Sequence, residues 1–86
     1  MAGSYPRSGK HVRISPEAVT AAALHHAGLS WFDGHTVDSV VDTSEPGNGT
    51  QSYQVEVTAD EAGIRVLVLL SVSEDDSCIH YRINDI

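Results

Sequence analysis

The chain has few of the features that mark secreted, membrane or nucleic-acid-binding proteins. It has one cysteine, Cys78, so no disulfide forms within the chain, and such sparse cysteine usage agrees with a reducing compartment. No stretch approaches the ~20 apolar residues that cross a bilayer. The first fourteen residues hold no apolar segment of the signal-peptide kind. We therefore expect a cytoplasmic protein with no membrane segment.

Positive charge is scarce and segregated. The chain has five Lys and Arg residues against twelve Asp and Glu, a net charge of −7. Arg7, Lys10 and Arg13 lie in residues 1–13, a stretch rich in Gly, Ser and Pro that we expect to be a flexible basic arm. The remainder holds every carboxylate and is strongly acidic, and an acidic body repels phosphate backbones. We therefore expect no binding of DNA or RNA over a broad face.

Alternation of apolar and polar residues is the clearest pattern in the chain. Between residues 51 and 72 it has a period of two, which is typical of strands because successive side chains point to opposite faces. The turn signal at 60–63 divides this stretch into strands over 51–59 and 64–73. Similar alternation predicts strands over 35–43 and 79–83.

A helix precedes the strands. Ser15 suits the N-cap, Pro16 the first helical position and Glu17 the positive helix end. The helix continues to Ala27, and Gly28 supplies the stop. The order of elements predicts a single α+β domain over 14–86, a two-layer sandwich with the N-terminal helix packed on a four-stranded antiparallel meander.

The sheet face away from the helix is expected to carry an apolar patch. The strand over 64–73 points Leu67 and Leu69 to that face, and Val40 of the strand over 35–43 is predicted to lie beside them. One helix cannot cover both faces, and exposed apolar patches commonly mark interfaces. Trp31 and Phe32 follow the helix, where they either plug the end of the core or form an exposed anchor for a partner. These residues predict a protein partner, which includes a second copy of the chain.

An alternative function rests on the acidic surface. An inhibitor or immunity-type protein would place carboxylates in a basic site on an enzyme, with charge steering its association. The candidate residues are Asp38, Asp42, Glu56 and the turn Glu74-Asp75-Asp76.

Catalytic, metal and cofactor sites have little support. His25 and His26 are neighbours on a helix and project about 100° apart, so they cannot chelate one ion together. Cys78 and His80 share a strand face, but a structural zinc site needs four ligands, and the pair lies about 7 Å apart, too far for a nucleophile and its base. We expect no enzyme activity, no metal and no cofactor; a small-ligand or metal binder that uses this pair remains a third hypothesis.

Taken in order, the elements resemble a PepSY-type domain. The resemblance rests on three segments: Ile14–Val19 with Ala22, Ala23 and His25–Gly28 for the helix, Tyr53–Val57 for a Y-x-V-x-V strand, and Val72–Ile79 for the family's V-D-x-x-T-G-x-[VI] turn. In that turn the family's Asp, Thr and Gly are replaced by Ser73, Asp76 and Ser77. The resemblance implies a small α/β domain with a role in peptidase inhibition or protein binding.

Overall fold

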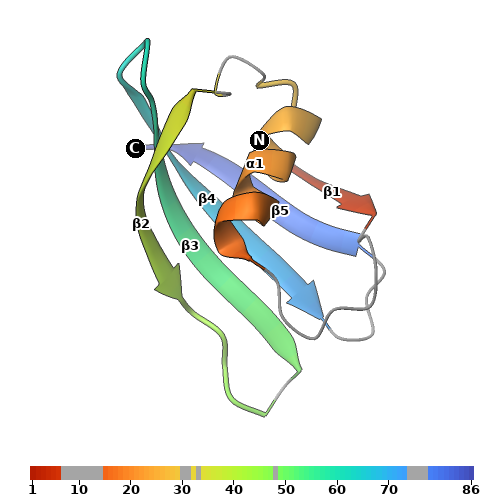
Figure 1. Cartoon of the computed structure of the whole chain (residues 1–86). Coiled ribbons are helices and arrows are strands. Elements are labelled where there is room, and N and C mark those ends of the chain that lie inside the picture. Colours follow the sequence, from red (N-terminus) through yellow and green to blue (C-terminus); the bar gives the residue numbers. More distant parts are fainter. Residues whose placement is uncertain (7–14, 30–31, 33, 48, 74–77) are drawn as a thin grey trace.

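The computed structural model describes residues 1–6, 15–29, 32, 34–47, 49–73 and 78–86. Within these residues one helix packs on one face of a five-stranded antiparallel sheet (Figure 1). The elements are β1 (Ala2–Pro6), α1 (Pro16–His26), β2 (His35–Asp42), β3 (Thr50–Ala59), β4 (Ile64–Ser73) and β5 (Cys78–Asp85). The order β1-β5-β4-β3-β2 makes β4 the central strand and β1 and β2 the edges. The predicted α+β class is confirmed.

The prediction of a four-stranded meander is wrong, because part of the predicted arm forms a fifth strand. β1 pairs with β5, with Gly3 opposite Tyr81 and Tyr5 opposite Ile79. Pro6 is tolerated because it ends an edge strand, where no partner needs its missing N–H. This pairing joins the two ends of the chain, so local periodicity gives no signal for it. Residues 7–13, the rest of the predicted arm, lie outside the described residues.

The predicted helix start and stop are confirmed. The Ser15 hydroxyl accepts from the Ala18 N–H at 3.5 Å, and Gly28 has a φ of 82°. The buried Thr20 hydroxyl donates to the Pro16 carbonyl at 2.6 Å, so its polar atom costs little to bury. Ala23 is fully buried, and its small side chain lets α1 lie close to the sheet.

The core lies between α1 and the sheet. Alternate residues of the three inner strands point into it, as the period of two predicts. Its strand members are Val55, Val57, Ala59, Val66, Val68, Leu70, Val72, Ile79, Tyr81 and Ile83. The opposite side of the sheet therefore receives the intervening side chains.

An aromatic cluster of Tyr5 on β1, His26 on α1 and Tyr81 on β5 packs β1 against the helix and β5. Their ring centroids are 5.7 to 6.1 Å apart. The Tyr5 hydroxyl donates to the Val19 carbonyl at 3.1 Å, and His26 Nδ1 hydrogen-bonds the Tyr81 hydroxyl at 2.8 Å. Burial raises the pKa of Tyr5 to about 12, and the neighbouring Tyr81 adds to the effect.

This pKa predicts a loss of stability at alkaline pH. Tyr5 of the unfolded chain ionises near its ordinary pKa of about 10, whereas the folded chain holds the proton until about pH 12. The contribution of Tyr5 is therefore complete below pH 10 and is lost as pH rises from 10 to 12. In urea unfolding at pH 8 and pH 11, we expect wild type to lose more stability between the two conditions than Tyr5→Phe does. Parallel losses in the two proteins would contradict this assignment.

Candidate functional site

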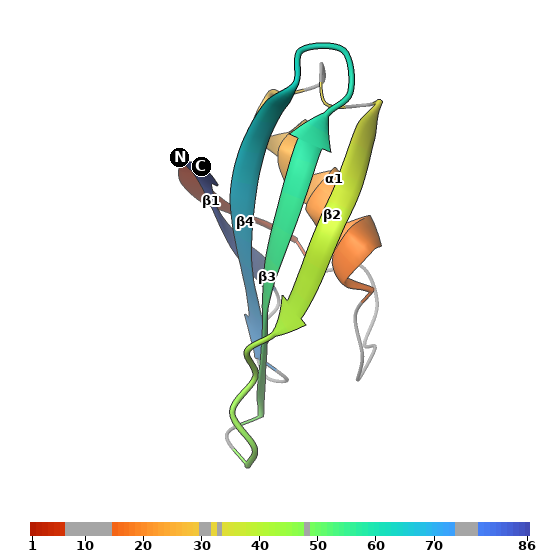
Figure 2. The ribbon, with the colours of Figure 1, turned by 90° about the vertical axis from the view of Figure 1, so that its left-hand side faces the viewer.

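The outer face is the side of the sheet away from α1, and no described element lies over it (Figure 2). Because paired residues of neighbouring strands point to the same side, the register assigns its members. Its central part consists of Ser39 and Val41 from β2, Gln54, Glu56 and Thr58 from β3, Arg65, Leu67, Leu69 and Ser71 from β4, and His80, Arg82 and Asn84 from β5. The face is mostly polar, with its leucines on the central strand.

Leu67 and Leu69 lie at the centre of the outer face, as predicted. Each is partly exposed. Leu67 is flanked by Glu56 on β3 and Asn84 on β5. Leu69 is flanked in the same way, by its pairing partners Gln54 on β3 and Arg82 on β5. The leucines therefore form a small apolar centre with polar neighbours on both sides.

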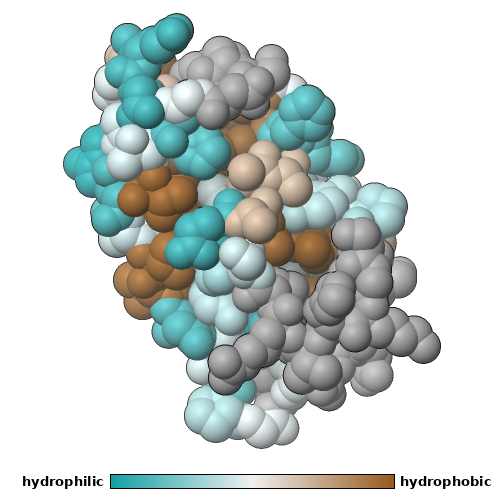
Figure 3. Space-filling model, in the orientation of Figure 1, coloured by the Kyte–Doolittle hydropathy of each residue, from teal (hydrophilic) through white to brown (hydrophobic). Residues whose placement is uncertain are grey.

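The predicted place of Val40 is wrong. The register shifts between Val37 and Ser39, which makes Asp38 the extra residue of a β-bulge. One extra residue reverses the alternation, so Val40 lies opposite the buried Val55 on the α1 side. Val40 is 38% exposed there. Figure 3 shows apolar surface, in brown, at the left of the view, where β2 lies in Figure 1.

Val41 takes the place that was predicted for Val40. It lies opposite Gln54 on the outer face and is 51% exposed. The strand alternation alone puts Val41 on the wrong side, and no residue type around Asp38 marks a bulge. The sequence pattern therefore contained no signal for this residue.

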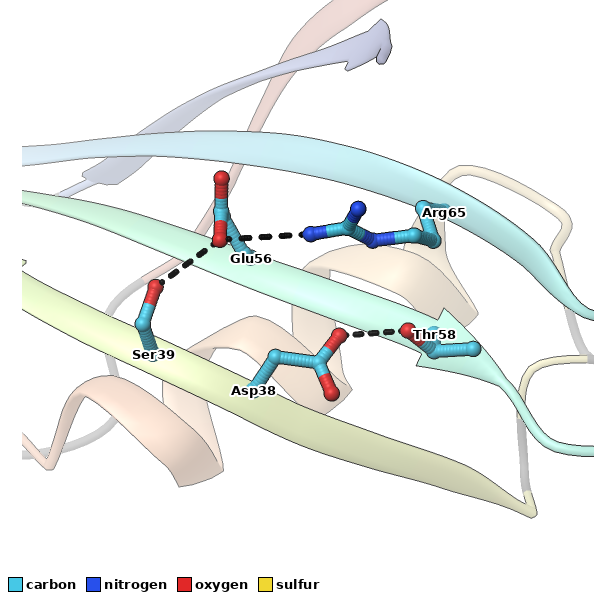
Figure 4. Close-up of polar contacts among 5 residues, drawn as sticks. All are labelled: Asp38, Ser39, Glu56, Thr58 and Arg65. Atoms are coloured by element: carbon cyan, nitrogen blue, oxygen red, sulfur yellow. Dashed lines mark hydrogen bonds and ion pairs between the residues drawn. The ribbon is translucent and has the colours of Figure 1, made fainter.

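The bulge turns two polar side chains onto the outer face (Figure 4). The Thr58 hydroxyl donates to the Asp38 carboxylate, and the Ser39 hydroxyl donates to Glu56 Oε2 at 3.2 Å. Arg65 forms an ion pair with the same Glu56 oxygen at 3.5 Å. Both partners of that pair are well exposed, so it stabilises the fold by at most about 1 kcal/mol.

The predicted acidic surface is divided. Asp38 and Glu56 share the outer face. Asp42 lies opposite Tyr53 on the α1 side, where its carboxylate accepts from the Ser44 N–H at 2.8 Å. The turn over 74–76 lies outside the described residues. The structure therefore brings together only two of the predicted carboxylates.

Phe32 belongs to the core and does not supply an exposed anchor. It is 1% exposed, and its carbonyl accepts from His35 Nδ1 at 2.6 Å. Of the two roles considered for it, only the core plug is compatible with this burial. Trp31 lies outside the described residues.

Cys78 and His80 lie on the outer face of β5, opposite Pro6 and Ser4 of β1. In the described part of the chain, no three His, Cys, Asp or Glu side chains come together to hold a metal ion. A shallow hollow of about 360 Å³ borders His80, and its lining includes Gln54, Leu69, Ser71 and Arg82. This hollow extends the leucine centre toward β5.

A second hollow, of about 380 Å³, opens on the α1 side. Its lining is mainly apolar and includes Leu29, Phe32, Ile64, Val66 and Ile83, with Asp85 at the border. The sequence pattern did not predict it, because its walls come from four separate segments, the fourth being Met1 at the N-terminus.

Over the described residues, no helix has the length and apolar character to cross a membrane. Comparison of the whole chain with family models, curated proteins and solved structures finds no match.

Proposed function

We propose that this chain is a non-catalytic domain that binds protein through the outer face around Val41, Leu67 and Leu69. The observation that supports this most is the sequence of the central strand. Residues 66–70 are apolar without interruption, a pattern typical of strands that are covered on both faces. In the described structure α1 covers one face of β4 and nothing covers the other.

The surroundings of the leucines suit a docking surface. Interfaces commonly have an apolar centre and a polar rim. Here Gln54, Glu56 and Arg82 surround the leucines with groups that can hydrogen-bond or pair with charge. Full burial of one leucine gains about 1.5–3 kcal/mol, so a partner that covers both leucines would gain a useful part of that free energy.

The acidic inhibitor is the weaker alternative. Among the described residues, only two of its candidate carboxylates, Asp38 and Glu56, share the outer face, which is little negative charge for a basic site on an enzyme. Asp42 lies on the opposite side of the sheet. The inhibitory role that the PepSY resemblance implies stays a prediction. Binding that weakens steeply with salt would favour this alternative over docking on the leucines.

Site-specific photo-crosslinking tests the proposal. A photoreactive amino acid replaces Leu69, and in a control protein it replaces Ala22, which is exposed on α1. In the cells that make the protein, we expect irradiation to yield a covalent protein adduct from position 69 and none from position 22. The absence of an adduct from position 69, or equal adducts from both positions, would refute docking on the outer face.

A further inference from the structure

We infer that the partner on the outer face is a second copy of this chain, packed face to face about a two-fold axis. This inference rests on the proposed function and specifies its partner. It is carried by the placement of charge around the leucines: the carboxylates of Asp38 and Glu56 lie on the β2–β3 half of the outer face, and Arg82 lies on the β5 half. Arg65 lies between the two halves, on the central strand β4, where it pairs with Glu56.

Glu56 and Arg82 lie at opposite corners of the leucine centre. Glu56 is beside Leu67 on β3, and Arg82 is beside Leu69 on β5. Because β3 and β5 flank β4 at equal spacing, the midpoint of the Glu56–Arg82 diagonal falls on β4, between the two leucines.

A two-fold axis through this midpoint makes the surface complementary to itself. The axis lies in the interface, perpendicular to the diagonal, so it places Glu56 over the partner's Arg82 and Arg82 over the partner's Glu56. Leu67 and Leu69 of both copies then meet at the centre. Such an isologous contact is the commonest kind in homo-oligomers. Glu56 is 39% exposed beside Arg65, which leaves it open to a second cation.

The size of the outer face suits a weak dimer. Five strands about 4.8 Å apart, with about eight residues each on average rising ~3.4 Å, give an outline of roughly 24 by 27 Å, or about 650 Å² per copy. Two copies would bury about 1,300 Å², near the lower end of specific interfaces. The bulge at Asp38 interrupts the β2 edge and disfavours a dimer formed by edge-to-edge pairing of β2 strands.

Charge reversal provides a sharp test. By sedimentation velocity from about 10 μM to about 1 mM, we expect wild type to form a dimer. Glu56→Arg and Arg82→Glu should each raise the dimer Kd about tenfold or more, because each substitution sets like charges against each other twice in the dimer. An equimolar mixture of the two variants should regain dimer, since each mixed pair restores both opposite-charge contacts. Glu61→Arg makes the same charge change as Glu56→Arg in the exposed β3–β4 turn and should dimerise like wild type.

Other results would contradict either the dimer or its proposed packing. A wild type that stays monomeric at every concentration overturns the inference, and an adduct between position 69 and a foreign protein would then still support the proposed function. A wild-type dimer whose two variants fail to recover on mixing overturns this packing. Recovery on mixing also shows that both variants are folded, so misfolding cannot imitate the expected result.

Discussion

Phe32→Ala is expected to lower the free energy of unfolding by about 3–5 kcal/mol, the usual cost of removing a buried aromatic side chain. Phe32 is 1% exposed and lies in the loop between α1 and β2. Its N–H donates to the Leu29 carbonyl at 2.9 Å, and its carbonyl accepts from His35. These bonds hold the backbone of Phe32 in place, so it cannot easily move to fill the cavity that the ring leaves.

Urea unfolding followed by circular dichroism measures this loss. Domains of this kind are stable by about 5–15 kcal/mol, so the variant is expected to lose a large fraction of its stability and to unfold at a clearly lower urea concentration than wild type. Val41→Ala is the control, measured like Phe32→Ala at low protein concentration so that contacts between copies do not contribute; Val41 is 51% exposed, so its truncation should change stability by no more than about 0.5 kcal/mol. Equal effects of the two substitutions would show that Phe32 does not support the core.

Gly3→Val is expected to release β1, with a loss of about 1–3 kcal/mol or more, the range for overpacked sites. A Cβ atom at Gly3 would lie 2.6 Å from the Tyr81 hydroxyl oxygen and 2.8 Å from Cζ. Gly3 does not have a positive φ, so the backbone itself accepts any residue and the obstacle is the ring. The ring cannot move aside freely, because its hydroxyl bonds His26 and its face packs near Tyr5.

Hydrogen exchange of the β5 amides that pair with β1 reports the release directly, alongside urea unfolding at low protein concentration. Ser4→Val is the control: it adds the same side chain one position along β1, on the exposed side opposite His80, and should leave exchange unchanged. Tyr81→Leu removes the obstacle, so the double variant should lose less stability than the sum of the two single variants. Additive losses would mean that the clash does not limit β1.

Several elements were predictable because their signals are local. The cap at Ser15 and the glycine at position 28 predicted where the helix begins and ends. The alternation of apolar and polar residues predicted β3, β4 and the turn between them. The placement of Leu67 and Leu69 on the outer face follows from the same alternation. These signals depend only on residues within a few positions of each other, which the backbone geometry of helices and strands translates directly into structure.

The bulge in β2 is a feature that local patterns did not predict. Strand alternation assumes one residue per pairing step, and the extra step at Asp38 exchanges the faces of Val40 and Val41. The polar contacts of Asp38 and Ser39 with Thr58 and Glu56 support the bulge, but they join different strands. Local sequence patterns therefore could not predict which β2 residues belong to the candidate site.

The sequence by itself determined the α+β class, the bounds of the helix and central strands, and the apolar character of both faces of β4. Only the tertiary structure decided that Ala2–Pro6 joins the sheet, that Val41 faces outward, and that Phe32 is buried. The physical reason is the range of the interactions. Periodicity and capping act between near neighbours in the chain, whereas strand pairing, bulge register and burial depend on contacts between distant segments that form together.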